Sequence, residues 1–252
     1  MISNARLKYL TSLKQKKYRQ KEGQFLIEGV NLIREAIENQ RIPKELFYSV
    51  DFGTKNLDAL VNNRDVKTTF LTTPQMKKLS DVTTPPGIIG LMLLLDSPFD
   101  EFSSSDKLLY LDDVSDPGNA GTLIRNACAF GMGGVLFSPD SCELYNPKLL
   151  RSTAGYVFQT KIAQDIDRKQ LKELQKLGFS LISTDLQDGL PINEHKCPAK
   201  SVLILGNEPR GISDDVNRIA DIKVKIPIAS DVDSLNVAAA GAVLMYWATR
   251  EQ

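Results

Sequence analysis

Two kinds of hydrophobic spacing alternate along the first 95 residues of the chain. Leucines recur at every third position over 7–13 behind Ser3, which predicts an amphipathic helix with a serine cap. Gly29 leads into a second helical pattern, and Thr73 is the predicted cap of a third helix that begins at Pro74. Apolar runs of strand length lie at residues 25–27, 46–50 and 88–95. Helices that alternate with strands predict a small α/β domain.

The same alternation continues after residue 106. We predict strands at residues 107–111, 135–138, 180–183 and 202–205. We predict helices at residues 117–130 and 167–177, and a last one at 235–250 that is capped by Ser234. An α/β fold with an open, mostly parallel sheet and helices on both faces suits this order. Ligands of such sheets bind beyond the carboxyl ends of the strands, which directs attention to the loops after Leu111, Leu205 and Ile226.

A polar stretch separates the two parts. Residues 97–106 contain Pro98 and a run of serines, a composition typical of a linker. We therefore predict an N-terminal domain at 1–96, a linker at 97–106 and a larger domain at 107–252.

The composition excludes several classes of protein. With 42% hydrophobic and 25% charged residues, the chain has the balance of a globular protein. No apolar stretch is long enough to span a bilayer, and the first residues do not form a signal peptide. Three scattered cysteines and the single His195 leave no disulfide framework, zinc site or Ser-His-Asp triad. We expect a cytoplasmic protein with no membrane contact and no metal.

Charge is distributed unevenly, although the formal net charge is zero. Residues 1–21 carry +7 with no Asp or Glu, so the rest of the chain carries −7. A concentrated basic segment attracts phosphates, and a solvated helix face explains the pattern equally well. The candidate nucleic-acid contacts are Arg6, Lys8, Lys14, Lys16, Lys17, Arg19 and Lys21.

Three loops that follow predicted strands carry the candidate chemistry. In the first, Gly118 and Gly121 flank the start of a helix that holds Arg125 two turns further on, an arrangement that suits an anion. A capped helix with a surface arginine is the structural alternative. The second loop, 205–213, places glycines and both signs of charge at a strand end, where a plain turn is the alternative. The third, 226–242, leads into an alanine-rich helix that core packing also explains.

Together, in this order, the loops match one family. The matching motifs are N-A-G-T-L-I-R at 119–125, Y-N-P-K-L-L-R-S-T-A-G at 145–155, L-G-N-E-P-R-G at 205–211 and S-L-N-V-A-A-A at 234–240. On these residues the chain resembles the SpoU (TrmH-like) family of SPOUT RNA ribose 2′-O-methyltransferases. Three ordered motifs are far more specific than a lone glycine pattern. Ser230 and the pair Pro209-Arg210 depart from the usual family residues.

The N-terminal part carries a second resemblance. Residues 8–30 are similar to the substrate-binding domain of SpoU enzymes that modify large-subunit ribosomal RNA, including mitochondrial forms. That domain resembles a small RNA-binding ribosomal-protein fold. The resemblance favours ribosomal RNA as the partner, and it covers roughly residues 1–95.

The family resemblance implies a fold and a cofactor. It implies a deep trefoil knot in the C-terminal part, a homodimer whose active site takes residues from both subunits, and S-adenosylmethionine bound in the knot. The residues that it implies for the cofactor are Leu205, Gly206, Asn207, Ile226, Ser234, Leu235 and Asn236.

The implied reaction moves a methyl group from a sulfonium to a ribose 2′-hydroxyl. The hydroxyl is a weak nucleophile, so it must be held in line and must lose its proton. Because a guanidinium stays protonated in proteins, we expect the family's catalytic arginine to act as a fixed cation and not as a general base. The implied catalytic residues are Asn119, Arg125, Glu208, Ser234 and Asn236, with Arg151 as a further RNA contact.

Several alternatives stay open at this point. A catalytically silent RNA-binding or ribosome-assembly factor of the same fold, a transfer-RNA methyltransferase and an enzyme acting on a base nitrogen all share much of the pattern. An ordinary nucleotide-binding enzyme is poorly supported, because neither a P-loop nor a G-x-G-x-x-G loop follows a strand.

Overall fold

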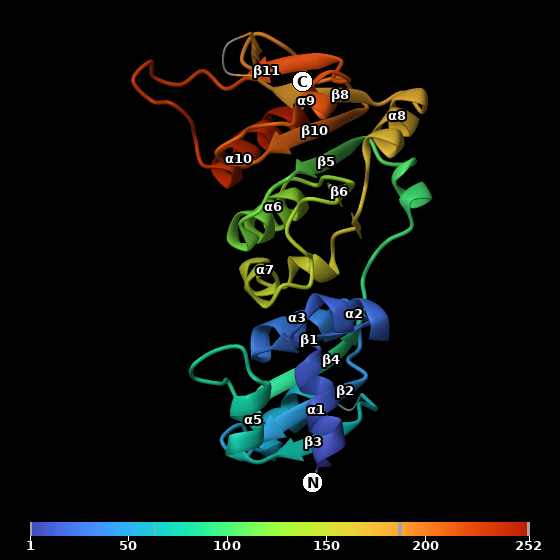
Figure 1. The fold of residues 1–252 in the computed structure, drawn as a ribbon, viewed down its shortest axis with the longest axis vertical. Coiled ribbons are helices and arrows are strands. Elements are labelled where there is room, and N and C mark those ends of the chain that lie inside the picture. Colours follow the sequence, from blue (N-terminus) through green and yellow to red (C-terminus); the bar gives the residue numbers. More distant parts are fainter. Residues whose placement is uncertain (1, 63, 186–187, 251–252) are drawn as a thin grey trace. The chain divides into compact units, whose positions relative to one another are not determined.

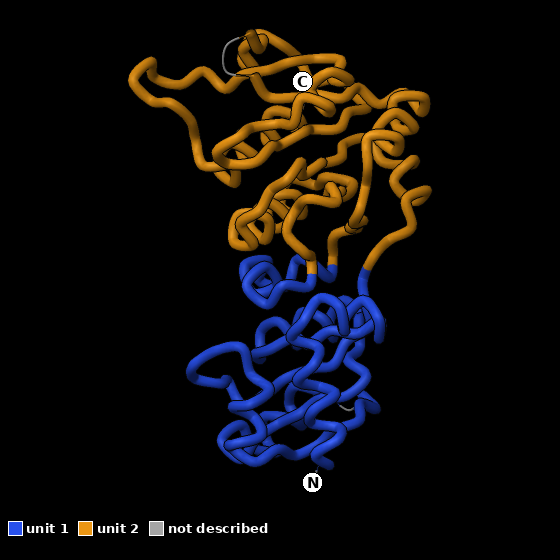
Figure 2. The backbone as a smooth tube through the Cα atoms, in the orientation of Figure 1, with its two compact units in different colours: residues 1–95, 145–158 blue, residues 96–144, 159–252 orange. Residues whose placement is uncertain are grey.

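The computed structural model describes residues 2–62, 64–185 and 188–250, and the chain divides into two compact units (Figure 2). The N-terminal unit consists of Met1–Leu95 together with Tyr145–Phe158, and the C-terminal unit of Asp96–Leu144 with Gln159–Gln252. The short segment 145–158, which we predicted within the C-terminal domain, therefore packs with the N-terminal unit. The cause is local: the Tyr145 ring lies 4.6 Å from the Phe25 ring, and its hydroxyl oxygen accepts the Leu95 amide at 2.7 Å.

The N-terminal unit contains a mixed four-stranded sheet with the order β1-β4-β2-β3 (Figure 1). The β1–β4 and β4–β2 pairs are antiparallel and the β2–β3 pair is parallel. One apolar cluster joins helices α1 and α5 to this sheet, while α3 contacts β1 and β4. The elements are α1 Asn4–Ser12, α2 Lys16–Glu22, β1 Gln24–Glu28, α3 Val30–Glu38, β2 Glu45–Ser49, α4 Thr54–Val61, β3 Thr68–Leu71, α5 Thr73–Leu79, β4 Ile88–Leu93, α7 Pro147–Ser152 and the 3-10 helix η2 Tyr156–Phe158.

The C-terminal unit contains a parallel seven-stranded sheet with the order β7-β6-β5-β10-β8-β11-β9 (Figure 1). This confirms the prediction of an α/β fold with a mostly parallel sheet. The elements are η1 Phe99–Phe102, β5 Lys107–Asp112, α6 Pro117–Ala129, β6 Gly134–Phe137, β7 Ile162–Ala163, α8 Arg168–Lys176, β8 Ser180–Thr184, β9 Leu190–Pro191, β10 Ser201–Gly206, α9 Asp214–Asn217, β11 Ile222–Lys225 and α10 Val237–Thr249.

Both faces of this parallel sheet are covered. Alternate side chains of β5, β6, β8 and β10 form one buried cluster with α8 and α9. On the other face, α10 packs against α6 and β10. The contact is close at Gly241, where a Cβ atom would lie 2.3 Å from Leu123 Cδ2 and 2.8 Å from Leu205 Cδ1. Gly241 of the last helix therefore serves this packing against β10 and α6.

The order of the strands creates a switch point between β5 and β10. From β5 the chain proceeds to β6 and β7 on one side, whereas β10 pairs with β5 on the other side. The loops after β5 and β10 consequently diverge at the carboxyl ends of neighbouring strands, where parallel sheets bind ligands.

Two helix caps differ from the prediction. The last helix begins after Asn236, whose side chain accepts the amides of Ala238 and Ala239, so Ser234 lies outside it. The helix at α5 begins one residue earlier than predicted, because Thr72 caps it and the Gln75 side chain accepts the Thr72 amide. In both places another oxygen-bearing side chain, two residues later at α10 and one residue earlier at α5, makes the bonds that an N-terminus needs.

The predicted linker holds structure of its own. The 3-10 helix η1 lies within residues 97–106, and the Phe102 side chain is fully buried in the core cluster of the parallel sheet. The hydrophobic contact of one aromatic ring outweighs the polar composition around it. Among the described residues, none of the helices combines the length and apolar character needed to cross a bilayer.

Candidate active site

A pocket of about 880 Å³ opens at the carboxyl ends of β8, β10 and β11. Its walls come from the end of β10 and the loop after it, from the loop after β11 and from the start of α10. Six of the seven residues that we predicted for the cofactor line it, namely Leu205, Gly206, Asn207, Ile226, Ser234 and Leu235. The second and third loops of the sequence pattern thus form one cavity.

The seventh predicted residue, Asn236, joins this pocket to the first loop. Its Nδ2 atom donates to Asn119 Oδ1 at 3.1 Å, and Asn119 Nδ2 donates in turn to Glu208 Oε1 at 2.6 Å. Both asparagines are held at helix starts: Asp116 accepts the Asn119 amide at 2.9 Å, and Asn236 caps α10. Three of the predicted catalytic side chains, from three loops, therefore form one continuous series of hydrogen bonds.

A second set of contacts ties the loop after β5 to the loop after β10. Asn207 is buried and donates through Nδ2 to the Asp113 carbonyl at 2.8 Å, while its backbone pairs with Gly211. The Arg210 Nη2 atom lies 2.6 Å from Asp113 Oδ2. Asp113 itself has a φ of +56°, a conformation that aspartate tolerates better than most residues. We infer that the main role of Asn207 is to hold the loop after β5 against the loop after β10.

The buried carboxylate of Asp112 lies at the same corner. Its Oδ2 atom accepts the Ser213 amide at 2.7 Å, which fixes the far end of the loop after β10. Burial raises the pKa of Asp112 and the nearby carboxylates Asp113 and Asp140 act in the same direction, whereas hydrogen bonds from Ser213 lower it. Neither Asp112 nor Asp113 is among the residues that we predicted for the site. Two acidic residues directly after an apolar strand were the available signal.

Gly206 is required by the protein's own backbone. A Cβ atom at this position would lie 2.3 Å from the Gly211 carbonyl carbon and from the Ile212 amide nitrogen. We expected this glycine to let a ligand approach the strand end. The contact that excludes a side chain there is instead the return of the loop over the strand, which shapes the pocket wall.

Arg125 lies outside the pocket of its own chain. It is exposed on α6, and among the described residues it forms no ion pair or side-chain hydrogen bond. The next residue, Asn126, donates to the Ala238 carbonyl at 3.2 Å and ties α6 to α10. The chain therefore brings Asn119, Glu208, Ser234 and Asn236 together at the pocket, and leaves Arg125 exposed on α6.

Cys142 supplies no nucleophile at this site. Burial, with the negative charges of Asp116 and Glu208 nearby, raises the pKa of its thiol to about 12. A thiol with that pKa stays protonated near neutral pH and reacts poorly. Within the described residues, no group of three or more metal-ligating side chains occurs either.

The predicted nucleic-acid contacts differ in accessibility. The prediction for Arg19 is wrong, because this side chain is buried and its Nη1 atom donates to the Leu13 and Lys14 carbonyls at 2.8 Å. Arg6 pairs with the buried Glu45, and Lys14 with Asp81. The exposed residues of the predicted set are Lys8, Lys16, Lys17, Lys21 and, on α7, Arg151.

Each of the two parts of the chain is similar to a known protein family. A model of the SpoU rRNA Methylase family matches residues 106–246, and a model of the MRM3-like substrate binding domain matches residues 4–90. Over 96% of its length the chain is 31% identical to the 23S rRNA (guanosine(2553)-2′-O)-methyltransferase RlmP of Bacillus subtilis, 95% of which is covered.

Solved structures agree with this similarity. The AdoMet-bound rRNA methyltransferase from Sinorhizobium meliloti is 25% identical with a TM-score of 0.85, and the match covers 98% of this chain and 95% of that one. The SpoU methyltransferase AviRb from Streptomyces viridochromogenes gives a TM-score of 0.89 at 24% identity, covering 98% and 97% of the two chains. The latter identity supports a shared fold alone.

Proposed function

The chain belongs to the SpoU rRNA methylase family, and on this basis we propose that it transfers a methyl group from S-adenosylmethionine to a ribose 2′-hydroxyl of 23S-type ribosomal RNA. The observation that carries the proposal is a pocket formed by two of the three loops, to which Asn119 of the first loop is joined by its hydrogen bonds with Glu208 and Asn236. A fold match alone would not distinguish an enzyme from a silent relative.

The pocket suits the cofactor. Its volume of about 880 Å³ lies in the range of small-molecule sites. Leu205, Ile226 and Leu235 offer apolar side chains, and the irregular segment 226–236 between β11 and α10 presents main-chain groups beside them. An adenosine needs this combination of apolar contact and main-chain hydrogen bonds. When bound there, the sulfonium supplies an activated methyl group.

The chain's own residues prepare the hydroxyl. Glu208 has one oxygen engaged by Asn119, and we assign its carboxylate the role of accepting the hydrogen bond, and then the proton, of the ribose hydroxyl. Asn119 and Asn236 hold that carboxylate in one orientation, and Ser234 lines the pocket on the opposite loop. Such positioning supplies a large part of the rate acceleration in group transfer.

Arg125 acts, in this proposal, in the site of a second copy. Family resemblance implies a homodimer, and the exposed positions of α6 and α10 support one. Val243 and Tyr246 are 40% and 58% exposed on α10, and Tyr246 stacks edge-on against Phe130 at 6.3 Å, on the helix pair that carries Arg125. An exposed apolar stripe beside an unpaired cation fits an isologous interface that delivers the cation to the partner.

The N-terminal unit serves RNA binding in this proposal. We assign salt-sensitive phosphate contacts to the exposed cations of the basic segment and to Arg151, but not to Arg19. A fold like that of a small RNA-binding ribosomal protein and a trefoil knot in the C-terminal unit belong to the same proposal, as do the predicted domain limits apart from residues 145–158. The match to a substrate-binding domain over residues 4–90 supports the first of these.

Two measurements test the function. Calorimetry with S-adenosylmethionine should show saturable binding, and purified protein should transfer labelled methyl to unmodified 23S rRNA in preference to transfer RNA. Cofactor binding without transfer to either RNA would favour a silent assembly factor. Preferential transfer to transfer RNA would contradict the proposed substrate.

A further inference from the structure

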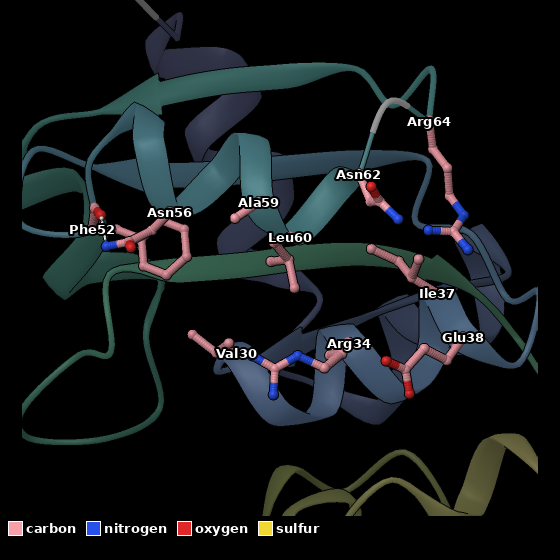
Figure 3. A pocket seen from close by; sticks show the side chains of 10 residues that line it. All are labelled: Val30, Arg34, Ile37, Glu38, Phe52, Asn56, Ala59, Leu60, Asn62 and Arg64. Atoms are coloured by element: carbon pink, nitrogen blue, oxygen red, sulfur yellow. Dashed lines mark hydrogen bonds between the residues drawn. The ribbon is translucent and has the colours of Figure 1, made fainter.

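A second cavity lies in the N-terminal unit, between α3 and α4, and encloses about 460 Å³ (Figure 3). We call it the α3–α4 pocket. It shares no lining residue with the candidate active site, and its walls come from neither the basic segment nor the three loops of the family pattern. Its volume lies in the range of small-molecule sites, so it has room for a ligand of the size of one nucleotide.

The inner wall of the α3–α4 pocket is apolar. Ile37 of α3 lines one side and is 2% exposed. Phe52 and Leu60 line the opposite side, and each is 8% exposed. Ala59 lines the pocket beside Leu60 and is exposed (Figure 3). Although little of Ile37, Phe52 and Leu60 is exposed, the surface that these three side chains leave at the base of the pocket is apolar and can contact a nucleobase without selecting its identity.

Two arginines stand at the rim of this apolar wall. Arg34 reaches it from α3 and Arg64 from the segment after α4, so they approach from opposite sides (Figure 3). Both side chains are exposed, and within the part of the chain that the structure describes neither forms an ion pair or a side-chain hydrogen bond. Guanidinium groups with their donors unengaged are well suited to phosphate oxygens. With Glu38 included, the charged lining residues carry +1.

Amides and a carboxylate complete the lining. Asn56 Nδ2 donates to the Phe52 carbonyl at 2.6 Å, so that side chain is oriented and offers its oxygen as an acceptor. Asn62 ends α4 with a φ of +47°, a conformation that asparagine tolerates, and its amide also lines the pocket. Together with Glu38 these groups can accept hydrogen bonds from base amino groups and from a ribose 2′-hydroxyl.

We propose that the α3–α4 pocket binds one unpaired nucleotide of RNA, with the base on the apolar wall and the neighbouring phosphates at Arg34 and Arg64. The inference rests on the proposed function only in taking the ligand from the RNA substrate. The pocket would hold the RNA at a point distinct from the methylated nucleotide. It would thereby add a specific, single-strand contact to the diffuse attraction of the basic segment.

Fluorescence anisotropy of a labelled, unstructured oligoribonucleotide on the full chain tests this at fixed salt. Arg34→Gln and Arg64→Gln should each weaken binding about tenfold. Ala59→Trp, which fills the pocket from an exposed position without changing charge, should weaken it by a similar factor. Lys55→Gln is the matched control, because Lys55 is an exposed cation on α4 outside the lining, and it should change the affinity less than about twofold.

The outcomes separate the possibilities. Equal weakening by Lys55→Gln and by the two arginine variants would show diffuse attraction and overturn the proposal. Unchanged affinity in Ala59→Trp, with a thermal melt like the wild type, would show that no base enters. Methyl transfer to rRNA is measured in parallel. If the wild type transfers methyl normally and the pocket variants keep wild-type RNA affinity, only the proposed nucleotide site is refuted. If the pocket variants weaken RNA binding but the wild type transfers no methyl group, only the proposed methyltransferase function is refuted.

Discussion

Asn119 Nδ2 donates to Glu208 Oε1 at 2.6 Å, although 89 residues separate the two positions in the chain. The bond joins the loop after β5 to the loop after β10, and Asn236 extends it to the start of α10. Hydrogen bonds between such exposed side chains contribute little to stability. What they provide is orientation of a carboxylate at the edge of a pocket.

Glu208→Gln should lower methyl transfer about 100-fold while leaving S-adenosylmethionine affinity within about twofold. Glutamine can still accept the hydrogen bond from Asn119, so the loops keep their arrangement, but it cannot take a proton. Transfer of labelled methyl to rRNA and calorimetry with the cofactor measure the two effects. Near-normal transfer by this variant would remove Glu208 as the proton acceptor.

Asn236 has two roles that two substitutions separate. Asn236→Ala loses the cap of α10 and should cost about 1 kcal/mol of unfolding free energy. Asn236→Asp keeps an acceptor for the amides of Ala238 and Ala239 but loses the donor to Asn119. We expect the aspartate variant to have wild-type stability with reduced transfer. Urea denaturation measures the stability of each variant, and the transfer assay measures its activity. Equal activity in the wild type and Asn236→Asp would contradict a role for the hydrogen-bond series.

Arg125 can be tested by mixing inactive variants. Arg125→Ala should abolish transfer and leave cofactor binding intact, because the side chain lies outside the pocket of its own chain. If it serves the partner's site, a mixed dimer of Arg125→Ala and Glu208→Gln contains one complete site. Random reassortment should then restore roughly a quarter of wild-type activity.

Failure of complementation would show that Arg125 serves the site of its own chain, provided that subunit exchange is confirmed by differential tagging. Sedimentation of the wild type checks the dimer itself. Val243→Asp on the exposed stripe of α10 should shift the protein toward monomers.

The buried Asp112 predicts a pH-dependent stability. Burial raises its pKa, so the folded protein binds the proton more readily than the unfolded chain does. The stability contributed by the protonated form is fully present below the ordinary pKa of aspartate and is lost as pH rises through the raised pKa. Asp112→Asn should therefore be more stable than the wild type at neutral pH, with a difference that shrinks toward acid pH. Denaturation series across pH measure this, and a pH-independent difference would contradict it.

The sequence predicted most strands, the parallel sheet and the loops that meet at the pocket, because continuous apolar runs and helix caps are local signals. It placed the boundary of α10 two residues too early, since Ser234 and Asn236 are both good caps and only the folded loop decides between them. It also missed the burial of Phe102, which depends on a sheet formed by distant residues.

Candidate site residues were predictable where they belong to a motif. Their hydrogen-bond partners were not predictable. Asn119, Glu208 and Asn236 came from the family pattern, but their mutual hydrogen bonds require three distant loops to converge. Arg19 was counted as a surface cation from its position in a basic run, although its guanidinium caps backbone carbonyls in the interior. The cytoplasmic location stays a prediction.

The central claim is that the methyl group reaches a ribose oxygen of 23S rRNA. Unmodified 23S rRNA labelled by the purified protein and methyl-labelled S-adenosylmethionine can be hydrolysed completely in alkali, which cleaves only after a free 2′-hydroxyl. We predict that the label is recovered in a single alkali-stable dinucleotide, and that Glu208→Gln yields almost none. Label in mononucleotides would place the methyl group on a base, and it would contradict ribose 2′-O-methylation.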